Sequence, residues 1–209
     1  MEPETEQPAS FSFDDLSEAE AARQIAKYPP GRQASAVISL LYLVQDQMGR
    51  MTGSAWVPRA GMDAVAARLE MAPIRVYEIA TFYTMFNLHP VGKWHLQICT
   101  TTPCWLRGSD EVVATCRAET GITGWGETSA DGLFTMSEVE CLGACVNAPM
   151  LQINNGDFYE DLNAERTKKL LDALRRAEPP PAGTMADRQT SAPEGGPNTL
   201  TTLQFEQGT

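Results

Sequence analysis

The sequence predicts an α+β protein that consists of an N-terminal helical bundle and a smaller α/β domain. Apolar residues recur at helical spacing through the first part of the chain. Alternating strand patterns begin at Lys93 and are interleaved with two further helical segments. From residue 178 the composition becomes rich in proline and glycine. We therefore expect a disordered N-terminus at 1–12, the helical bundle at 13–90, the α/β domain at 91–177 and a linker or disordered tail at 178–209.

Charge and cysteine content narrow the possible functions. The 209 residues include 16 Lys and Arg against 27 Asp and Glu, a net charge of −11. This balance argues against non-specific nucleic-acid binding and against a polybasic membrane patch. No apolar run is long enough for a membrane span, and the start M-E-P-E-T-E-Q is neither a secretory signal nor a transit peptide. We expect a soluble protein of a reducing compartment, where five cysteines favour metal or redox sites over disulfides.

Four helices are expected in the bundle, at 14–28, 32–49, 58–69 and 73–86. The second is the clearest, with one apolar face and Gly49 at its expected end; the face consists of Val37, Leu40, Leu41, Val44 and Met48. Pro73 suits the first position of the fourth helix. That helix carries four aromatic residues, Tyr77, Phe82, Tyr83 and Phe86. We interpret them as core packing, with the alternative that some of them face a partner protein.

The α/β domain opens with a strand at 93–99, where Trp94, Leu96 and Ile98 alternate with His95, Gln97 and Cys99. This alternation is typical of a half-buried strand. The pattern then predicts a helix at 109–119, strands at 132–140, 150–154 and 158–161 with a hairpin turn at Asn155-Gly156, and a helix from the capping Asn163 to about Ala177. The order β-α-β-β-α resembles the thioredoxin type of fold. In the tail, Leu200, Leu203 and Phe205 offer a docking segment as an alternative to plain disorder.

Four of the five cysteines form two pairs with the spacing C-x4-C-x36-C-x3-C. Cys99 and Cys104 lie in C-T-T-T-P-C, and Cys141 and Cys145 lie in C-L-G-A-C. A thiol–disulfide oxidoreductase would need C-x-x-C, which neither pair has. A closed four-cysteine zinc site is compatible with the gaps. A [2Fe–2S] site is favoured, because each iron needs two thiolates and the longer gaps suit a cluster that is wider than one ion.

The residues around the cysteines are compatible with a cluster. Small residues in both loops bring backbone N–H donors close to the sulfurs; they are Thr100, Thr101, Thr102, Gly143 and Ala144. Cys116 falls at core spacing on a helix and is interpreted as a buried thiol. His95 is interpreted as a strand residue with a local hydrogen bond. Arg107, Glu138 and Glu140 are interpreted as solvated surface charges, although each can tune the site. A Rieske-type site needs two histidines near the cysteines, and neither His89 nor His95 lies in a cysteine loop.

Four stretches taken together resemble a known family. They are R-V-Y-E-I-A-T-F-Y-T-M-F, C-T-T-T-P-C, G-L-F-T-M-S-E-V-E-C-L-G-A-C-V-N-A-P-M and Y-E-D-L. They resemble the thioredoxin-like [2Fe–2S] subunit of respiratory complex I, the small partner of the flavoprotein subunit in NADH:quinone oxidoreductase. The resemblance covers roughly residues 20–177. It implies a helical bundle followed by a thioredoxin-like domain. It also implies that Cys99 and Cys104 hold one iron and that Cys141 and Cys145 hold the other.

The resemblance further implies that electrons come from FMN on the flavoprotein subunit, which oxidises NADH, and that the cluster exchanges single electrons with the flavin. No Gly-rich phosphate loop follows a strand here, so we expect neither NAD nor FMN on this chain and no NADH oxidation by it alone. Other peripheral-arm subunits of complex I are further expected partners. The alternatives are the equivalent subunit of an NAD-linked formate dehydrogenase or hydrogenase, and a zinc-stabilised interaction module. We expect a place at the cytoplasmic face of a bacterial inner membrane, or in the mitochondrial matrix if the protein is eukaryotic.

Overall fold

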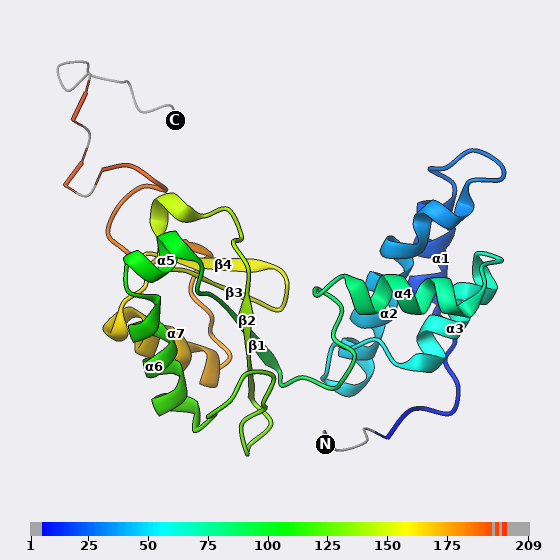
Figure 1. The fold of residues 1–209 in the computed structure, drawn as a ribbon, viewed down its shortest axis with the longest axis horizontal. Coiled ribbons are helices and arrows are strands. Elements are labelled where there is room, and N and C mark those ends of the chain that lie inside the picture. The colour runs from blue at the N-terminus through cyan, green and yellow to red at the C-terminus, as the bar shows by residue number, and fades with distance from the viewer. Residues whose placement is uncertain (1–5, 194, 197, 200–209) are drawn as a thin grey trace. The chain divides into compact units, whose positions relative to one another are not determined.

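A computed structural model describes residues 6–193, 195–196 and 198–199. The chain divides into two compact units, Met1–Lys93 and Trp94–Thr209 (Figure 1). The first unit is helical and the second combines helices with a five-stranded sheet. The protein is therefore of the α+β class. None of the helices in the described ranges is long and apolar enough to cross a membrane.

All four predicted helices of the first unit are present, with shifted ends. They are α1 (Asp15–Ile25), α2 (Val37–Thr52), α3 (Arg59–Arg68) and α4 (Pro73–Phe82), and the short 3-10 helix η1 (Gln33–Ala36) precedes α2. Asp14 caps α1 by accepting a hydrogen bond from the Ser17 backbone N–H at 2.7 Å. Gly49 does not end α2, contrary to the prediction. The helix continues to Thr52 and is capped by Gly53, whose φ of +79° is the left-handed conformation common at helix C-termini.

The predicted apolar face of α2 is confirmed as the centre of the first core. Leu40, Leu41 and Val44 are fully buried. The aromatic residues around α4 divide between two environments. Phe86 is buried, whereas 76% of Phe82 is exposed. The interpretation as core packing is therefore right for Phe86 and wrong for Phe82, because α4 ends at Phe82 and the chain turns there.

The described part of the N-terminal segment contacts the first unit, although residues 1–12 were predicted to be disordered. Buried Gln47 donates from Nε2 to the Ser12 carbonyl at 2.8 Å and accepts from the Asp14 N–H at 3.0 Å. Phe11 and Phe13 pack against the core. The prediction rested on the polar composition of this segment and did not foresee a buried glutamine that satisfies its backbone groups.

The second unit contains a sheet with strand order β2-β1-β3-β4-β5. The strands are β1 (Trp94–Cys99), β2 (Phe134–Val139), β3 (Leu151–Ile153), β4 (Asp157–Glu160) and β5 (Gly183–Thr184). β1 is parallel to β2 and antiparallel to β3, and β3 and β4 form an antiparallel pair. The turn between β3 and β4 is centred on Asn154 and Asn155, which have φ of +52° and +57°. The prediction of Asn155-Gly156 was therefore one residue too far along the chain.

β1 is buried on both faces, which corrects the prediction of a half-buried strand. Leu96 and Ile98 pack in the second core, and His95, Gln97 and Cys99 on the other face are each less than 5% exposed. The polar side chains have partners: His95 Nε2 lies 2.8 Å from Ser137 Oγ, and Gln97 Nε2 donates to Asn155 Oδ1 at 2.6 Å. These hydrogen bonds satisfy the polar groups of His95 and Gln97 within the buried face.

Two helices share the core of this unit with the sheet. They are α6 (Ser109–Thr120) and α7 (Ala164–Arg175), which lie side by side (Figure 1). Gly121, with φ of +73°, ends α6 as predicted. The predicted cap of α7 is also confirmed, since the Asn163 side chain accepts a hydrogen bond from the Arg166 N–H at 2.8 Å. Both helices therefore begin and end within a few residues of the predicted bounds.

The segment after α7 differs from the predicted disordered tail. Residues 180–192, called here the C-terminal strap, lie along β4. β5 within the strap pairs in parallel with β4, and the Tyr159 hydroxyl donates to the Pro180 carbonyl at 3.0 Å. The prediction relied on the proline- and glycine-rich, polar composition, whereas the strap is held by polar and backbone contacts and by Met185, which packs against the second core. Leu200, Leu203 and Phe205 lie outside the described residues.

Candidate metal centre

The parallel pairing of β1 and β2 brings both cysteine loops to one edge of the sheet. Cys99 is the last residue of β1 and lies opposite Val139, the last residue of β2. Because parallel strands end at the same edge, Cys141, two residues beyond Val139, emerges beside Cys99. The fold thus joins two loops that are separated by a helix and a strand in sequence.

The first cysteine pair is buried and belongs to regular structure. Cys99 ends β1, and Cys104 lies in the short helix α5 (Thr102–Leu106). Cys99 is 1% exposed and Cys104 is 2% exposed, and Ala148 and Met150 pack against them. No helix was expected at the position of α5. Pro103 in its first turn was the available signal, because proline is favoured there.

The second cysteine pair is exposed and lies in irregular structure. The Sγ atoms of Cys141 and Cys145 are 3.3 Å apart. Gly143 between them has a φ of +87°, a conformation that glycine adopts without strain, and its backbone N–H bonds to the Cys141 sulfur. Cys145 is the first residue of the 3-10 turn η2 (Cys145–Asn147).

Thr101 and the cysteine sulfurs connect the two loops. Thr101 Oγ1 lies 3.2 Å from Cys99 Sγ, and the same side chain hydrogen-bonds to Cys141. The Cys145 thiol interacts electrostatically with both Cys99 and Cys104. All four predicted sulfurs therefore gather in one place. Their role as ligands remains a prediction at this point.

Burial and hydrogen bonding give the four thiols different acidities. Burial, with a smaller effect of Cys99, raises the pKa of Cys104 to about 12, although the Met150 N–H acts in the opposite direction. The Gly143 N–H and the hydrogen bond with Cys145 lower the pKa of Cys141. The hydrogen bond to Cys141 raises the pKa of Cys145. A buried thiol with this acidity calls for a bound cation if it is to be a thiolate at neutral pH.

A known family matches this chain over most of its length. Residues 21–175 match the family described as thioredoxin-like [2Fe-2S] ferredoxin. The chain belongs to this family. One [2Fe–2S] cluster is its cofactor, and the two cysteine loops lie within the matched residues.

Two relatives are similar to this chain along nearly their whole length. The chain is 51% identical over 166 residues to an NADH-quinone oxidoreductase subunit of Rickettsia bellii, with 79% of this chain and 95% of that protein covered. It is 50% identical to the corresponding protein of Rickettsia conorii over the same shares. Among solved structures, an NAD+-reducing [NiFe]-hydrogenase in the H2-reduced state aligns with a TM-score of 0.57 at 18% identity. That alignment covers 69% of this chain and only 23% of the hydrogenase chain, and it supports the fold alone.

The donor set fits a [2Fe–2S] cluster. Each loop offers two sulfurs, which is what one iron of a four-thiolate cluster requires. The family assignment, and not the number of thiols, decides for the cluster over a four-cysteine zinc site.

The remaining residues near the site behave largely as the sequence predicted. Cys116 is fully buried in the second core, which raises its pKa to about 12 and confirms its interpretation as an apolar thiol. His95 makes the expected local hydrogen bond, to Ser137. Arg107 and Glu138 are exposed. Thr100 donates to Glu138 Oε1 at 2.5 Å, so among the three threonines it is Thr101 whose hydroxyl reaches the sulfurs.

Proposed function

We propose that this chain is the electron-transfer subunit of an NADH:quinone oxidoreductase and holds its [2Fe–2S] cluster between the two cysteine loops. In this proposal Cys99 and Cys104 bind one iron and Cys141 and Cys145 bind the other. The observation that carries the proposal is the parallel β1–β2 pair, which delivers two thiol pairs to one edge of the sheet. The choice of host complex rests on relatives named as NADH-quinone oxidoreductase subunits, which are about half identical and almost fully covered.

The protein side chains have separate tasks in this proposal. A [2Fe–2S] cluster bound here supplies one-electron oxidation and reduction. Burial of Cys99 and Cys104 keeps water from one side of the site. The N–H groups of Gly143 and Met150 and the hydroxyl of Thr101 offset negative charge on the sulfurs, which is greatest in the reduced state.

The exposed cysteine pair marks the side on which electrons are exchanged with FMN of the flavoprotein subunit. Exposed apolar side chains follow the cysteines directly in sequence: Trp105 and Leu106 follow Cys104, and Val146 follows Cys145. Tryptophan is enriched at protein interfaces, and exposed apolar side chains that lie together mark interaction surfaces. NADH oxidation and the flavin itself belong to the partner, so this chain alone oxidises no NADH.

The proposed location follows from the host complex. The chain is held peripherally by other subunits at the cytoplasmic face of a bacterial inner membrane, or in the mitochondrial matrix if it is eukaryotic. An NAD-linked hydrogenase or formate dehydrogenase is less well supported as host, because the hydrogenase likeness is limited to 18% identity and to the fold.

A ligand variant with a matched control tests the cluster assignment. The purified protein is expected to be reddish-brown, to bleach with dithionite and then to show the EPR signal of a reduced [2Fe–2S] cluster. Cys141→Ala should abolish that signal, and Cys116→Ala should leave it intact, because Cys116 lies in the second core. A colourless protein with one zinc per chain, or a signal that survives Cys141→Ala, would show that the assignment is wrong.

The host complex is tested separately by gentle lysis and affinity purification of the tagged chain. An FMN-containing subunit should co-purify, and the isolated pair should oxidise NADH with an artificial acceptor. Recovery without any flavoprotein would contradict the complex I assignment and leave the cluster assignment unaffected.

A further inference from the structure

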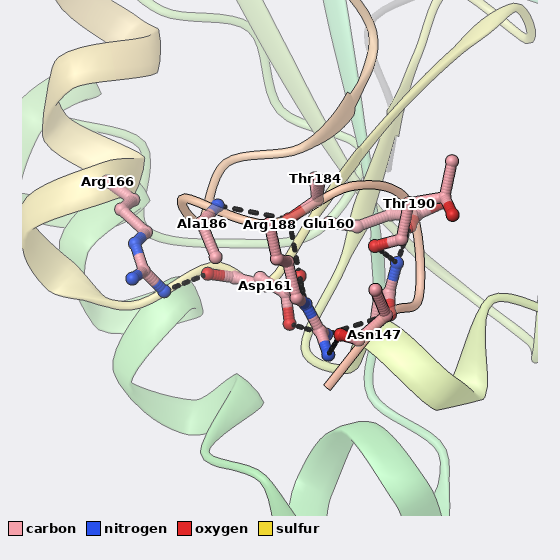
Figure 2. A network of polar contacts seen from close by, with 9 residues as sticks. Asn147, Glu160, Asp161, Arg166, Thr184, Ala186, Arg188 and Thr190 are labelled. Carbon is pink, nitrogen blue, oxygen red and sulfur yellow. Dashed lines mark hydrogen bonds and ion pairs between the residues drawn. The ribbon is translucent and has the colours of Figure 1, made fainter. Parts of the chain in front are cut away.

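The C-terminal strap contacts the turn that follows the second cysteine pair. We propose that Arg188 in the strap is a positioning residue for this turn: through Asn147 it fixes where Cys145 presents its sulfur. The inference rests on the proposed function, since it takes Cys145 as a cluster ligand. Figure 2 shows Arg188 between Asp161 and Asn147, at the centre of the polar network.

Arg188 is held in one orientation by a buried carboxylate. Its Nε donates to Asp161 Oδ2 at 2.9 Å, and its Nη2 donates to Asp161 Oδ1 at 2.5 Å. The side chains are only 14% and 9% exposed. This two-point contact fixes the plane of the guanidinium group, which a lysine ammonium cannot reproduce.

Further contacts of Arg188 reach Asn147 and the strap itself. Nη2 also donates to Asn147 Oδ1 at 2.8 Å, and Nη1 donates to the Ala192 carbonyl at 3.1 Å. Asn147 is 5% exposed, and its Nδ2 donates to Glu160 Oε2 at 2.5 Å and to the Thr190 carbonyl at 3.2 Å. Both ends of the Asn147 amide are therefore engaged, and its side chain has little freedom to turn.

Asn147 transmits this constraint to Cys145 because both lie in η2. The Asn147 N–H donates to the Ala144 carbonyl at 3.1 Å, and its own carbonyl accepts from the Asp161 N–H at 2.7 Å. A three-residue 3-10 turn has few internal hydrogen bonds to define its geometry. The outside contacts of Asn147 therefore determine the orientation of the turn that begins with Cys145.

Asp161 is itself fixed from two further directions. The Thr184 hydroxyl donates to Asp161 Oδ2 at 2.5 Å, and Arg166 Nη1 donates to the Asp161 carbonyl at 2.8 Å. The network thus joins α7, the end of β4, the strap and the cysteine loop (Figure 2). A buried ion pair is by itself weak evidence of a stabilising role, but one that is connected to a ligand loop suits a positioning role.

The test uses the full chain loaded with its cluster and compares Arg188→Gln, Arg188→Lys and Asn147→Ala with the wild type. We expect a changed line shape in the reduced EPR spectrum and release of iron to a chelator about 10- to 100-fold faster, the usual effect of losing a residue behind a metal ligand. Arg188→Lys keeps the charge beside Asp161 and should show the smaller effect. Arg176→Gln is the matched control, because Arg176 is an exposed arginine paired with Glu178.

Circular dichroism and thermal unfolding of the same variants separate positioning from folding. The spectral change must appear at temperatures far below the unfolding transition. If Arg188→Gln does not fold, Arg188→Lys, which retains the buried charge pair, decides the outcome. Wild-type EPR line shape and release rate in Arg188→Lys and Asn147→Ala would overturn the proposal.

Ligand variants show which proposal has failed. If Cys145→Ala loses the cluster while the Arg188 and Asn147 variants behave as the wild type, only the positioning role is wrong. If Cys145→Ala retains the wild-type signal, the proposed ligand set is wrong, and the positioning role is overturned with it.

Discussion

The two cysteine pairs are held in place by different means. Cys99 and Cys104 are buried and belong to a strand and a helix, so backbone hydrogen bonds position them. Cys141 and Cys145 are exposed and lie in an irregular loop, and Arg188 from a distant part of the chain hydrogen-bonds to Asn147 at the end of that loop. One half of the site is thus held by regular secondary structure, and the other half is held by side-chain contacts from elsewhere in the chain.

The two pairs also differ in the acidity of their thiols. Burial makes Cys104 a weak acid, whereas the Gly143 N–H makes Cys141 a stronger one. In the chain without its cluster, the exposed pair should therefore be the reactive half and the buried pair the inert half.

Alkylation of the cluster-free chain offers the largest expected difference between the pairs. With a pKa of about 12, only about one Cys104 thiol in ten thousand is ionised at pH 8, and its burial adds a steric barrier. We expect Cys141 to react with iodoacetamide at least about 100-fold faster than Cys104. Mass spectrometry of digested samples taken over time measures both rates. Buried Cys116 is the internal control and should react as slowly as Cys104.

The same experiment in denaturant should bring all five cysteines to similar rates. If Cys104 reacted as fast as Cys141 in the folded chain, the first loop would open readily and the contrast between the pairs would be lost. If Cys141 were as slow to alkylate as Cys104 in the folded chain, the expected difference between the pairs would also be wrong.

The contrast also explains how far the sequence could predict this site. Strand alternation predicted that Cys99 and Cys141 leave the ends of strands, and the parallel pairing in the structure places those ends side by side. The gaps within each pair disfavoured a dithiol redox site and favoured a [2Fe–2S] cluster, while a zinc site stayed open. These successes concern features that depend on neighbouring residues in sequence, such as periodicity and caps.

The features that the sequence did not reveal depend on long-range contacts. The strap was predicted to be disordered because its composition is polar and rich in proline and glycine, yet Arg188 pairs with a buried carboxylate 27 positions earlier in the chain. The strand at 93–99 was predicted to be half-buried, and only the fold shows that His95 and Gln97 find polar partners in Ser137 and Asn155. No local pattern encodes a polar partner that is supplied from elsewhere in the fold.

His95 in β1 contacts Ser137 in β2, the two strands that carry the cysteine loops. Its titration tests whether this part of the sheet is buried as the structure shows. Burial lowers its pKa from 6.5 to about 4, and its Nδ1 has no hydrogen-bond partner among the described residues. The folded state therefore holds the neutral form, while the unfolded chain takes up a proton below pH 6.5. Between pH 7 and pH 5 the wild type should lose about 2 kcal/mol of stability through this group.

Urea unfolding of the wild type and His95→Gln at the two pH values measures this loss. The variant lacks the titrating group, so its stability should fall by about 2 kcal/mol less than that of the wild type over the same range. The carboxylates are common to both proteins and cancel in the difference. An identical pH dependence in the two proteins would contradict a buried neutral His95.

The smallest expected effect concerns Thr101, whose hydroxyl reaches sulfurs of both loops. A hydrogen bond to a ligand sulfur stabilises the more negative, reduced cluster, so Thr101→Val should lower the midpoint potential by about 20–60 mV, the equivalent of roughly 0.5–1.4 kcal/mol for one electron. Thr100→Val is the matched control, because that hydroxyl donates to Glu138 at 2.5 Å and should leave the potential nearly unchanged. Redox titration followed by EPR measures both variants. A larger shift for Thr100→Val than for Thr101→Val would show that surface charge near Glu138, and not the hydroxyl shared by the two loops, sets the potential.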